Sequence, residues 1–204
     1  MSETRSCRRA LEAVSGQGER AARRAFLKAV AGVGIGLPIA SIPARAQGDA
    51  ASLRPKEGDL LVKANGLTPQ ALSVDDVPVA AGPIMVWSID PTDRTVRSGS
   101  RFNRVMLVRF DPEKLSDETR SLSAGGVVAY TAICTHSGCE VADWLADEQL
   151  LYCSCHSSKF DPKNGARVVD GPAPRSLPAL PLKTVQGQLT VAGPFTARVG
   201  FESP

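Results

Sequence analysis

The stretches CTHSGC, residues 134–139, and CSCHSSKFD, residues 153–161, hold most of the metal-binding side chains of this chain. The 204-residue sequence has five cysteines and two histidines, and both histidines and four of the cysteines lie in these two stretches. Cysteine thiolates and imidazoles are the ligands of zinc sites and of iron–sulfur centres. The two stretches therefore predict a metal centre that joins two loops of one domain.

The spacing of these residues gives two ligand pairs, Cys134 with His136 and Cys153 with His156, each able to close on one metal centre from a tight loop. A structural zinc site with two cysteines and two histidines is one interpretation. It leaves Cys139 and Cys155 unexplained, one in each loop. A disulfide between these two cysteines would tie the loops together, and it would require an oxidising compartment.

The head of the chain predicts an export signal. Paired arginines, Arg23-Arg24, precede an apolar stretch over 29–42, and Ala44-Arg45-Ala46 has the form of a cleavage site. The arginine pair resembles the twin-arginine signal of bacteria. We expect residues 1–46 to be cleaved after Ala46 or kept as a membrane anchor, although the apolar stretch is shorter than the about 20 residues of a spanning helix. An amphipathic first helix is the alternative.

Charge and composition argue against a nucleic-acid partner. Residues 1–46 hold eight basic and three acidic side chains, whereas residues 47–204 hold sixteen basic and eighteen acidic ones. The body of the protein is therefore slightly acidic, and it has no basic run for phosphate binding. An aromatic content of 5% also disfavours a surface on which bases stack.

The pattern of short apolar runs and turn residues after residue 58 predicts an all-β domain over 59–204, preceded by a linker over 47–58. A hairpin turn is expected at Gln186-Gly187, and one short helix at 112–120. The expected strands are 59–63, 84–89, 105–110, 127–133, 149–152, 180–185 and 189–192.

The two ligand stretches closely resemble those of the Rieske iron–sulfur proteins, and the resemblance covers residues 130–193 and the export signal. It implies one [2Fe-2S] cluster, with Cys134 and Cys153 on one iron and His136 and His156 on the other. Cys139 and Cys155 match the disulfide pair of the cytochrome bc type of Rieske protein. The implied fold is an antiparallel β-sandwich or incomplete barrel, into which a small cluster-binding subdomain, about 131–176, is inserted.

Further positions match the family or depart from it. Residues 171–174, Gly-Pro-Ala-Pro, resemble the proline loop that covers the cluster, and Ser158 matches a serine that bonds to a bridging sulfide. Phe160 stands where many high-potential members have a tyrosine whose hydroxyl bonds to a ligand sulfur. Ser137 stands where respiratory members usually have a leucine that faces the quinone pocket.

The resemblance implies an electron-transfer subunit at the periplasmic face of a bacterial membrane, and not a catalyst on its own. Electrons and protons would enter at His136 and His156, coming from quinol at a cytochrome b and leaving to a c-type cytochrome. The alternative partner is the catalytic subunit of a periplasmic dehydrogenase, as in arsenite oxidase. A zinc-stabilised periplasmic binding module without redox activity is a third hypothesis.

Overall fold

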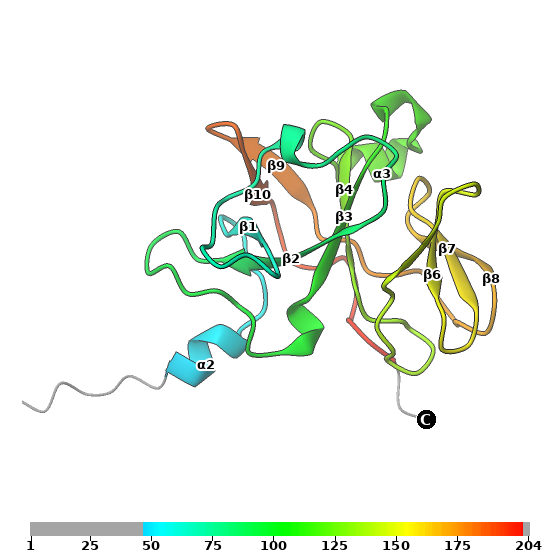
Figure 1. The fold of residues 1–204 in the computed structure, drawn as a ribbon, viewed down its shortest axis with the longest axis horizontal. Helices are drawn as coiled ribbons and strands as arrows, with labels where there is room; N and C mark the ends of the chain where they lie inside the picture. The colour runs from blue at the N-terminus through cyan, green and yellow to red at the C-terminus, as the bar shows by residue number, and fades with distance from the viewer. Residues whose placement is uncertain (1–46, 202–204) are drawn as a thin grey trace, which may run out of the picture. The chain divides into compact units, whose positions relative to one another are not determined.

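A computed structural model describes residues 47–201, which form two antiparallel sheets (Figure 1). The predicted export signal over 1–46 lies outside the described residues. Within 47–201, no helix combines the length and the apolar character needed to cross a membrane. Short helical segments precede the first strand or connect later ones: α2 (Gln47–Ser52), η1 (Val74–Asp76), η2 (Arg101–Asn103), η3 (Pro112–Lys114) and α3 (Asp117–Ser121).

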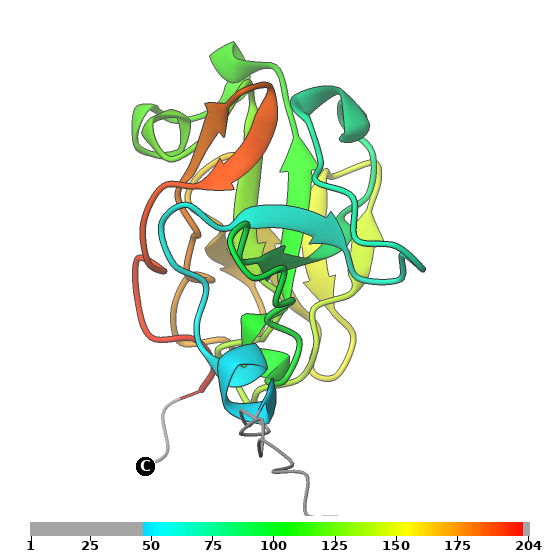
Figure 2. The ribbon, with the colours of Figure 1, turned by 90° about the vertical axis from the view of Figure 1, so that its left-hand side faces the viewer.

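The larger sheet has six strands in the order β4-β3-β2-β1-β10-β9, and Figure 2 shows that it is curled. Its strands are β1 (Leu60–Lys63), β2 (Ile84–Ile89), β3 (Val105–Arg109), β4 (Val127–Thr131), β9 (Leu182–Val185) and β10 (Gln188–Val191). Pairing of Leu60 with Thr190 joins the two ends of the domain in one sheet. In the β9–β10 turn, Gln186 and Gly187 both have positive φ, as a type I′ turn requires, so the predicted hairpin is confirmed.

The smaller sheet has four strands that follow one another in sequence, and it lies between β4 and β9 along the chain. Its strands are β5 (Asp143–Leu145), β6 (Leu150–Cys153), β7 (Ser158–Asp161) and β8 (Arg167–Asp170). In Figure 1 it stands beside the larger sheet, in yellow and light orange. The all-β, antiparallel fold class is confirmed.

Strands β3 and β4 separate two hydrophobic clusters, which explains why nearly all their side chains are buried. Successive side chains of a strand point to opposite faces. Met106 and Tyr130 therefore join the cluster against the smaller sheet, together with Leu151 and Phe160. The alternate residues of both strands join the cluster inside the curled sheet. Tyr130 also donates a hydrogen bond to the carbonyl of Pro162 at 2.9 Å, which links the two sheets.

The prediction of a single helix over 112–120 is wrong, because the segment forms two separate helical turns, η3 and α3. Asp111 accepts from the backbone N–H of Glu113 at 3.1 Å and begins the first turn. Ser116 then takes an extended ψ of 155°, and its hydroxyl accepts from the N–H of Thr119 at 3.2 Å. A serine in this position caps a new helix instead of continuing the old one.

Residues 47–58, expected as a linker, begin with α2 and make specific contacts with the segment 97–103. The N–H of Gly99 donates to the carbonyl of Ala51 at 2.9 Å, and the side-chain amide of Asn103 donates to the carbonyl of Leu53 at 2.7 Å. Arg97, in the same segment, is buried and pairs with Asp59 at 2.6 Å. The chain from Ala50 onward is therefore attached to the sheet that follows it.

Candidate metal centre

The first ligand loop follows β4 and closes on itself through backbone hydrogen bonds. The N–H of Cys134 donates to the carbonyl of Cys139 at 2.8 Å, and the N–H of Gly138 donates to the carbonyl of Cys134 at 3.1 Å. Next to the loop, the N–H of Val141 donates to the carbonyl of Ala132 at 2.8 Å. These bonds give the CTHSGC segment a fixed, narrow shape in which Cys134 lies at the base.

The second ligand loop is the tight turn between β6 and β7. Cys153 pairs with Ser158 as the last residue pair of the two strands, so residues 154–157 form the turn itself. Ser157 has a φ of +61°, in the left-handed region that favours glycine. The hydroxyl of Tyr152 donates to Ser157 Oγ at 3.1 Å, so a side-chain contact accompanies this backbone conformation.

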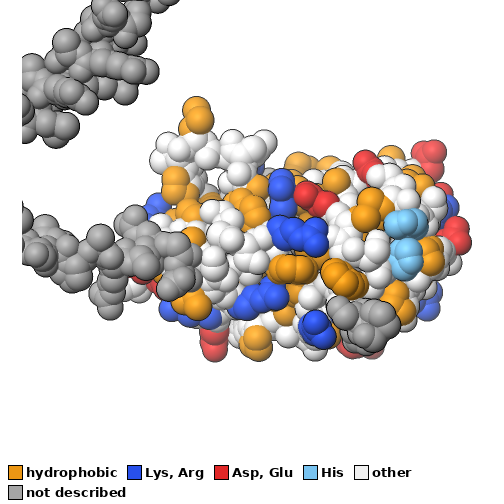
Figure 3. Space-filling view, turned by 90° about the horizontal axis from the view of Figure 1, so that it is seen from below, with side chains coloured by type: hydrophobic (Ala, Val, Ile, Leu, Met, Phe, Trp, Pro, Cys, Tyr) orange, Lys and Arg blue, Asp and Glu red, His pale blue; other side chains and the backbone are white. Residues whose placement is uncertain are grey.

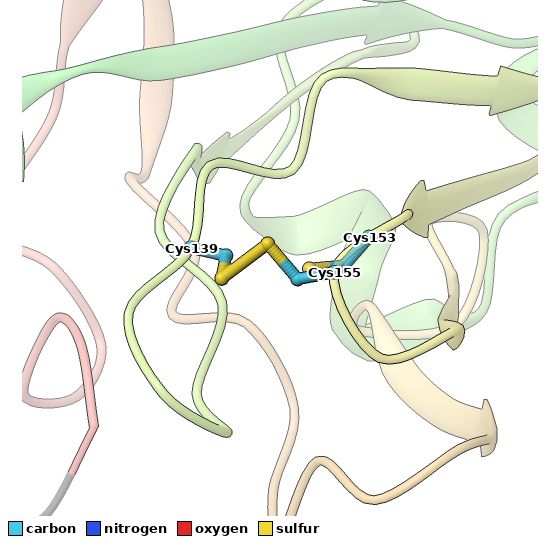
Figure 4. A group of neighbouring side chains, drawn as sticks. All are labelled: Cys139, Cys153 and Cys155. Atoms are coloured by element: carbon cyan, nitrogen blue, oxygen red, sulfur yellow. A yellow bond between two sulfur atoms is a disulfide. The ribbon is translucent and has the colours of Figure 1, made fainter.

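A disulfide joins Cys139 of the first loop to Cys155 of the second, as Figure 4 shows, which confirms the predicted pairing. The sulfur of Cys153 lies within 4.8 Å of both disulfide sulfurs. Within residues 47–201 the free thiols are those of Cys134 and Cys153, and both are buried. The disulfide thus leaves one thiol in each loop available to a metal.

The structure brings the four predicted ligands together in two pairs of different character. The thiol of Cys153 neighbours that of Cys134 in the interior, where both side chains are buried. At the surface, the Nδ1 atoms of His136 and His156 face each other at 3.2 Å, with ring planes at 86° (Figure 3). Two imidazole nitrogens close together at the surface and two free thiols in the interior suit a binuclear centre with an inner sulfur end and an outer nitrogen end.

The surroundings of Cys134 keep its thiol protonated until a cation binds. The pKa of Cys134 is raised to about 11, mainly because the thiol is buried. A hydrogen bond from the backbone N–H of His136 lowers this pKa in part, and the neighbouring Cys153 raises it. A buried thiolate needs a positive partner, and a metal ion supplies one when it binds. The raised pKa is therefore consistent with a thiol that ionises when a metal binds.

The segment 171–175, which contains the proline loop (residues 171–174), contacts both ligand loops. The N–H of Ala173 donates to Ser158 Oγ at 3.2 Å, and the hydroxyl of Thr135 donates to the carbonyl of Arg175 at 2.6 Å. Gly171 has a φ of +87°, and a Cβ there would lie 2.5 Å from the Cα of Ser158. Since Ser158 Oγ accepts from this loop, its proton remains available for another acceptor. The role of Thr135, which lies within the CTHSGC motif, was not predicted from the sequence.

The two departures from the family pattern have different environments. Ser137 is exposed at the tip of the first loop, and its hydroxyl is 3.7 Å from the sulfur of Cys139. Phe160 is completely buried, in the same hydrophobic cluster as Cys134 and Cys153. The first position faces outward, whereas the second lies in the cluster that contains both thiols.

Residues from distant parts of the sequence also support the first loop. Arg101 donates to the carbonyl of Gly138 at 2.8 Å, and a Cβ at Gly138 would lie 2.8 Å from Cδ1 of Phe201. Arg175 donates to the carbonyl of Gly200 at 2.7 Å and so holds the segment that carries Phe201. No local motif marks these residues, so sequence reasoning did not find them.

Comparison with known sequences gives a consistent family. A profile described as the Rieske [2Fe-2S] domain matches residues 96–181. A Streptomyces lividans protein named cytochrome bc1 complex Rieske iron-sulfur subunit is 33% identical over 147 residues, which cover 71% of this chain and 85% of that protein. A Haloferax mediterranei protein named putative respiratory nitrate reductase subunit Rieske is 39% identical over 106 residues. That match covers 51% of this chain and 47% of the relative, so the chain spans about half of that protein.

Solved structures with detectable likeness include the soluble domain of Rieske protein II from Sulfolobus acidocaldarius, at 24% identity and a TM-score of 0.35. This match covers 47% of the present chain and 66% of that one. A chain of a hyperthermophilic respiratory complex III is 21% identical with a TM-score of 0.40. It covers 88% of this chain and 94% of its own length.

Proposed function

Because this chain belongs to the Rieske [2Fe-2S] family, we propose that it is an electron-transfer protein, the iron–sulfur subunit of a bacterial quinol–cytochrome c reductase-like complex. The family assignment rests on the Streptomyces lividans relative, of which the chain covers 85% at 33% identity. The observation that carries the proposal is the pair of facing imidazoles at the surface, above two buried free thiols.

The ligand assignment follows from the two pairs. Cys134 and Cys153 would hold the inner iron, and His136 and His156 the outer iron. When bound there, the cluster accepts and releases single electrons, and its two neutral imidazoles raise its reduction potential to between about −150 and +300 mV. The hydrophobic cluster around the two buried thiols keeps water from the sulfur end. The imidazoles, which are more exposed, give electrons and protons a short path to a partner.

The proposed partners are a cytochrome b with bound quinol and a c-type cytochrome, at the periplasmic face of the inner membrane. The name of the Streptomyces lividans relative supports this choice. A disulfide between the ligand loops suits an oxidising compartment, and the twin-arginine pattern at the head of the chain would direct export. Membrane association would come from residues 1–46 if they are retained.

Metal analysis and absorption spectroscopy test the ligand assignment. The purified protein should be red-brown, with two irons per chain, and His156→Leu should abolish the colour because the outer iron loses one of its two protein ligands. Ser154→Ala, in the same turn and exposed, is the matched control and should keep both iron and colour. A colourless protein with one zinc would overturn the proposal in favour of the zinc-stabilised module.

A second candidate is the small Rieske subunit of another periplasmic oxidoreductase, of the arsenite-oxidase kind. Two observations favour it: the exposed Ser137 in place of an apolar residue, and the name of the Haloferax mediterranei relative. Gentle purification of the full chain from membranes separates the two candidates. A b-type haem that copurifies supports the first, whereas a catalytic subunit without b-type haem supports the second.

A further inference from the structure

We propose that a surface beside His136 docks an acidic protein, namely the c-type cytochrome that accepts the electron. The contact is made through two arginines and three apolar side chains. This surface, called here the arginine face, consists of Leu53, Arg54, Arg101, Phe102 and Phe201. The inference rests on the proposed function and goes further, because it names the surface and the charge of the partner.

The two arginines of the face are held in place without losing their charge. Their guanidinium groups lie 5.6 Å and 4.9 Å from the ring centroid of Phe102, for Arg54 and Arg101 respectively. Arg54 donates to the carbonyl of Phe102 and Arg101 to that of Gly138, each at 2.8 Å. Among the described residues, neither arginine forms an ion pair with a carboxylate. Two cations are thus preorganised for an outside anion, which lowers the entropic cost of docking.

Apolar side chains complete the arginine face. Leu53 is 59% exposed and Phe201 is 36% exposed, and both are among the few large hydrophobic side chains that the described residues leave open to solvent. Arginine and aromatic residues are enriched in the centres of protein interfaces. An arginine–aromatic pair flanked by exposed apolar groups therefore has the composition of a docking surface.

The arginine face adjoins the two imidazoles, through which electrons are proposed to pass between the cluster and its partners. Gly138, which accepts the bond from Arg101 and lies close to the ring of Phe201, is two residues from His136. Figure 3 shows Lys and Arg side chains and hydrophobic groups on the same side of the molecule as both histidines. A partner seated here would bring its own redox centre near the imidazoles.

The positive charge of the arginine face argues against two other binding partners: the head of this chain and a second copy of it. The head of this chain, residues 1–46, carries five more basic than acidic residues, so it would be repelled by the two arginines. A second copy bound through the same face in a two-fold dimer would bring two more arginines into the interface, and this accumulation of positive charge opposes association. An acidic protein surface suffers neither penalty, and it would be steered to this face although the body of the chain is slightly acidic overall.

Electron-transfer kinetics test the inference with charge reversal. Arg54→Glu changes the face, and Arg120→Glu is the control for net charge. Arg120 lies in α3, outside the arginine face, and is also exposed; it donates to the carbonyl of Leu115 and pairs with Asp117. The reduced holoprotein is mixed in a stopped-flow instrument with a c-type cytochrome of acidic surface and with one of basic surface. Rates are measured over a range of ionic strength.

For the acidic cytochrome at low salt, Arg54→Glu should lower the bimolecular rate about tenfold and weaken its dependence on salt, while Arg120→Glu stays near the wild type. Equal effects of both substitutions would overturn the inference, because net charge alone would then explain them. Binding of the wild type to phosphatidylglycerol vesicles, lost in Arg54→Glu while the cytochrome rates stay unchanged, would overturn it in favour of a membrane.

Oxidation by ferricyanide separates failure of this inference from failure of the proposed function. If ferricyanide oxidises all three proteins alike and the cytochrome rates do not differ, the arginine face is wrong and the electron-transfer function stands. If the protein neither holds iron nor donates electrons to ferricyanide, the proposed function fails.

Discussion

Phe160 offers a test of how one side chain sets the electron affinity of the site. The residue is fully buried in the cluster that contains both free thiols, and Phe160→Tyr would introduce a hydroxyl there. Hydrogen bonds to cluster sulfurs stabilise the reduced, more negative form. We therefore expect a higher reduction potential in the variant, measured by voltammetry.

The matched control for this prediction is Phe110→Tyr. Phe110 belongs to the same hydrophobic cluster, but it packs against Trp144, with ring centroids 6.4 Å apart. This control should leave the potential unchanged. An unchanged or lower potential in Phe160→Tyr would show that the hydroxyl does not reach a sulfur.

Gly171 tests whether the proline loop must touch the second ligand loop. Gly171→Ala should lower the free energy of unfolding and make the cluster labile, because the new Cβ would collide with the backbone of Ser157 and Ser158. Gly165→Ala is the control: Gly165 also has a positive φ, of +64°, but no atom lies within 4 Å of its Cβ position. Gly165→Ala should lower the free energy of unfolding by only about 1 kcal/mol, the strain of an alanine in the left-handed region. Equal losses in both variants, by thermal unfolding and iron retention, would argue against a tight contact.

At the scale of an element, the disulfide is expected to support the two ligand loops and not the β domain as a whole. Cys139→Ser should cost about 3 kcal/mol, the value for closing a loop of this length, and it should leave a folded domain with a labile cluster. Circular dichroism and the rate of iron loss would measure the two effects. Loss of the whole fold would contradict the prediction.

A thiol count on the wild type, without residues 1–46, gives an independent test of the same pairing. After iron is removed, the denatured and unreduced protein should titrate as two free thiols. A count of four would mean that Cys139 and Cys155 are not joined.

Sequence reasoning predicted the larger sheet well and the smaller sheet poorly. Every strand of the larger sheet was expected within two residues of its observed ends, because these strands are apolar runs bounded by turn residues. In the smaller sheet β6 was expected, whereas β5, β7 and β8 were not. β5 has three residues, and β8 is mostly exposed. β7 begins at Ser158, in a segment whose polar residues serve the site, so its pattern did not indicate a strand.

The site shows the same division between local and long-range information. The ligand stretches and the disulfide pair were recognisable, because short spacing rules govern them. Arg101 and Phe201 were not, since they meet Gly138 only after folding, at sequence separations of 37 and 63 residues. The break in the helix expected over 112–120 was missed for another reason. Serine is tolerated inside a helix and also caps a new one, and the sequence pattern does not show which role Ser116 has.

At the scale of the whole molecule, a buried charge cluster ties the start of the domain to β2 and makes its stability depend on pH. Arg97 pairs with Asp59 at 2.6 Å and with Asp90 at 3.2 Å. Hydrogen bonding to Lys56, with help from the N–H of Thr92, lowers the pKa of Asp90 to about 2. Because folding lowers the pKa of Asp90, its carboxylate contributes its full stabilisation when the pH is above the ordinary pKa of 3.8. This contribution is lost as the pH falls toward 2.

Chemical unfolding at several pH values tests this linkage. The difference in unfolding free energy between the wild type and Asp90→Asn should shrink by roughly 2 kcal/mol between pH 5 and pH 2. Asp147→Asn, at an exposed carboxylate, is the control and should differ little from the wild type at either pH. A constant difference for Asp90→Asn would mean that its carboxylate is not held by these partners.

The nearness of Cys153 to the disulfide has a consequence for storage and repair. Its sulfur lies within 4.8 Å of both bridged sulfurs, so metal ligation would occupy the one thiol best placed for exchange. In the apoprotein, deprotonated Cys153 can attack the sulfur of Cys155 and release the thiolate of Cys139. The scrambled chain keeps one disulfide, but a ligand is now trapped in it. Iron loss should therefore become irreversible with time in non-reducing buffer. A mild reductant, then air oxidation to re-form the native disulfide, and then addition of iron and sulfide should restore the protein.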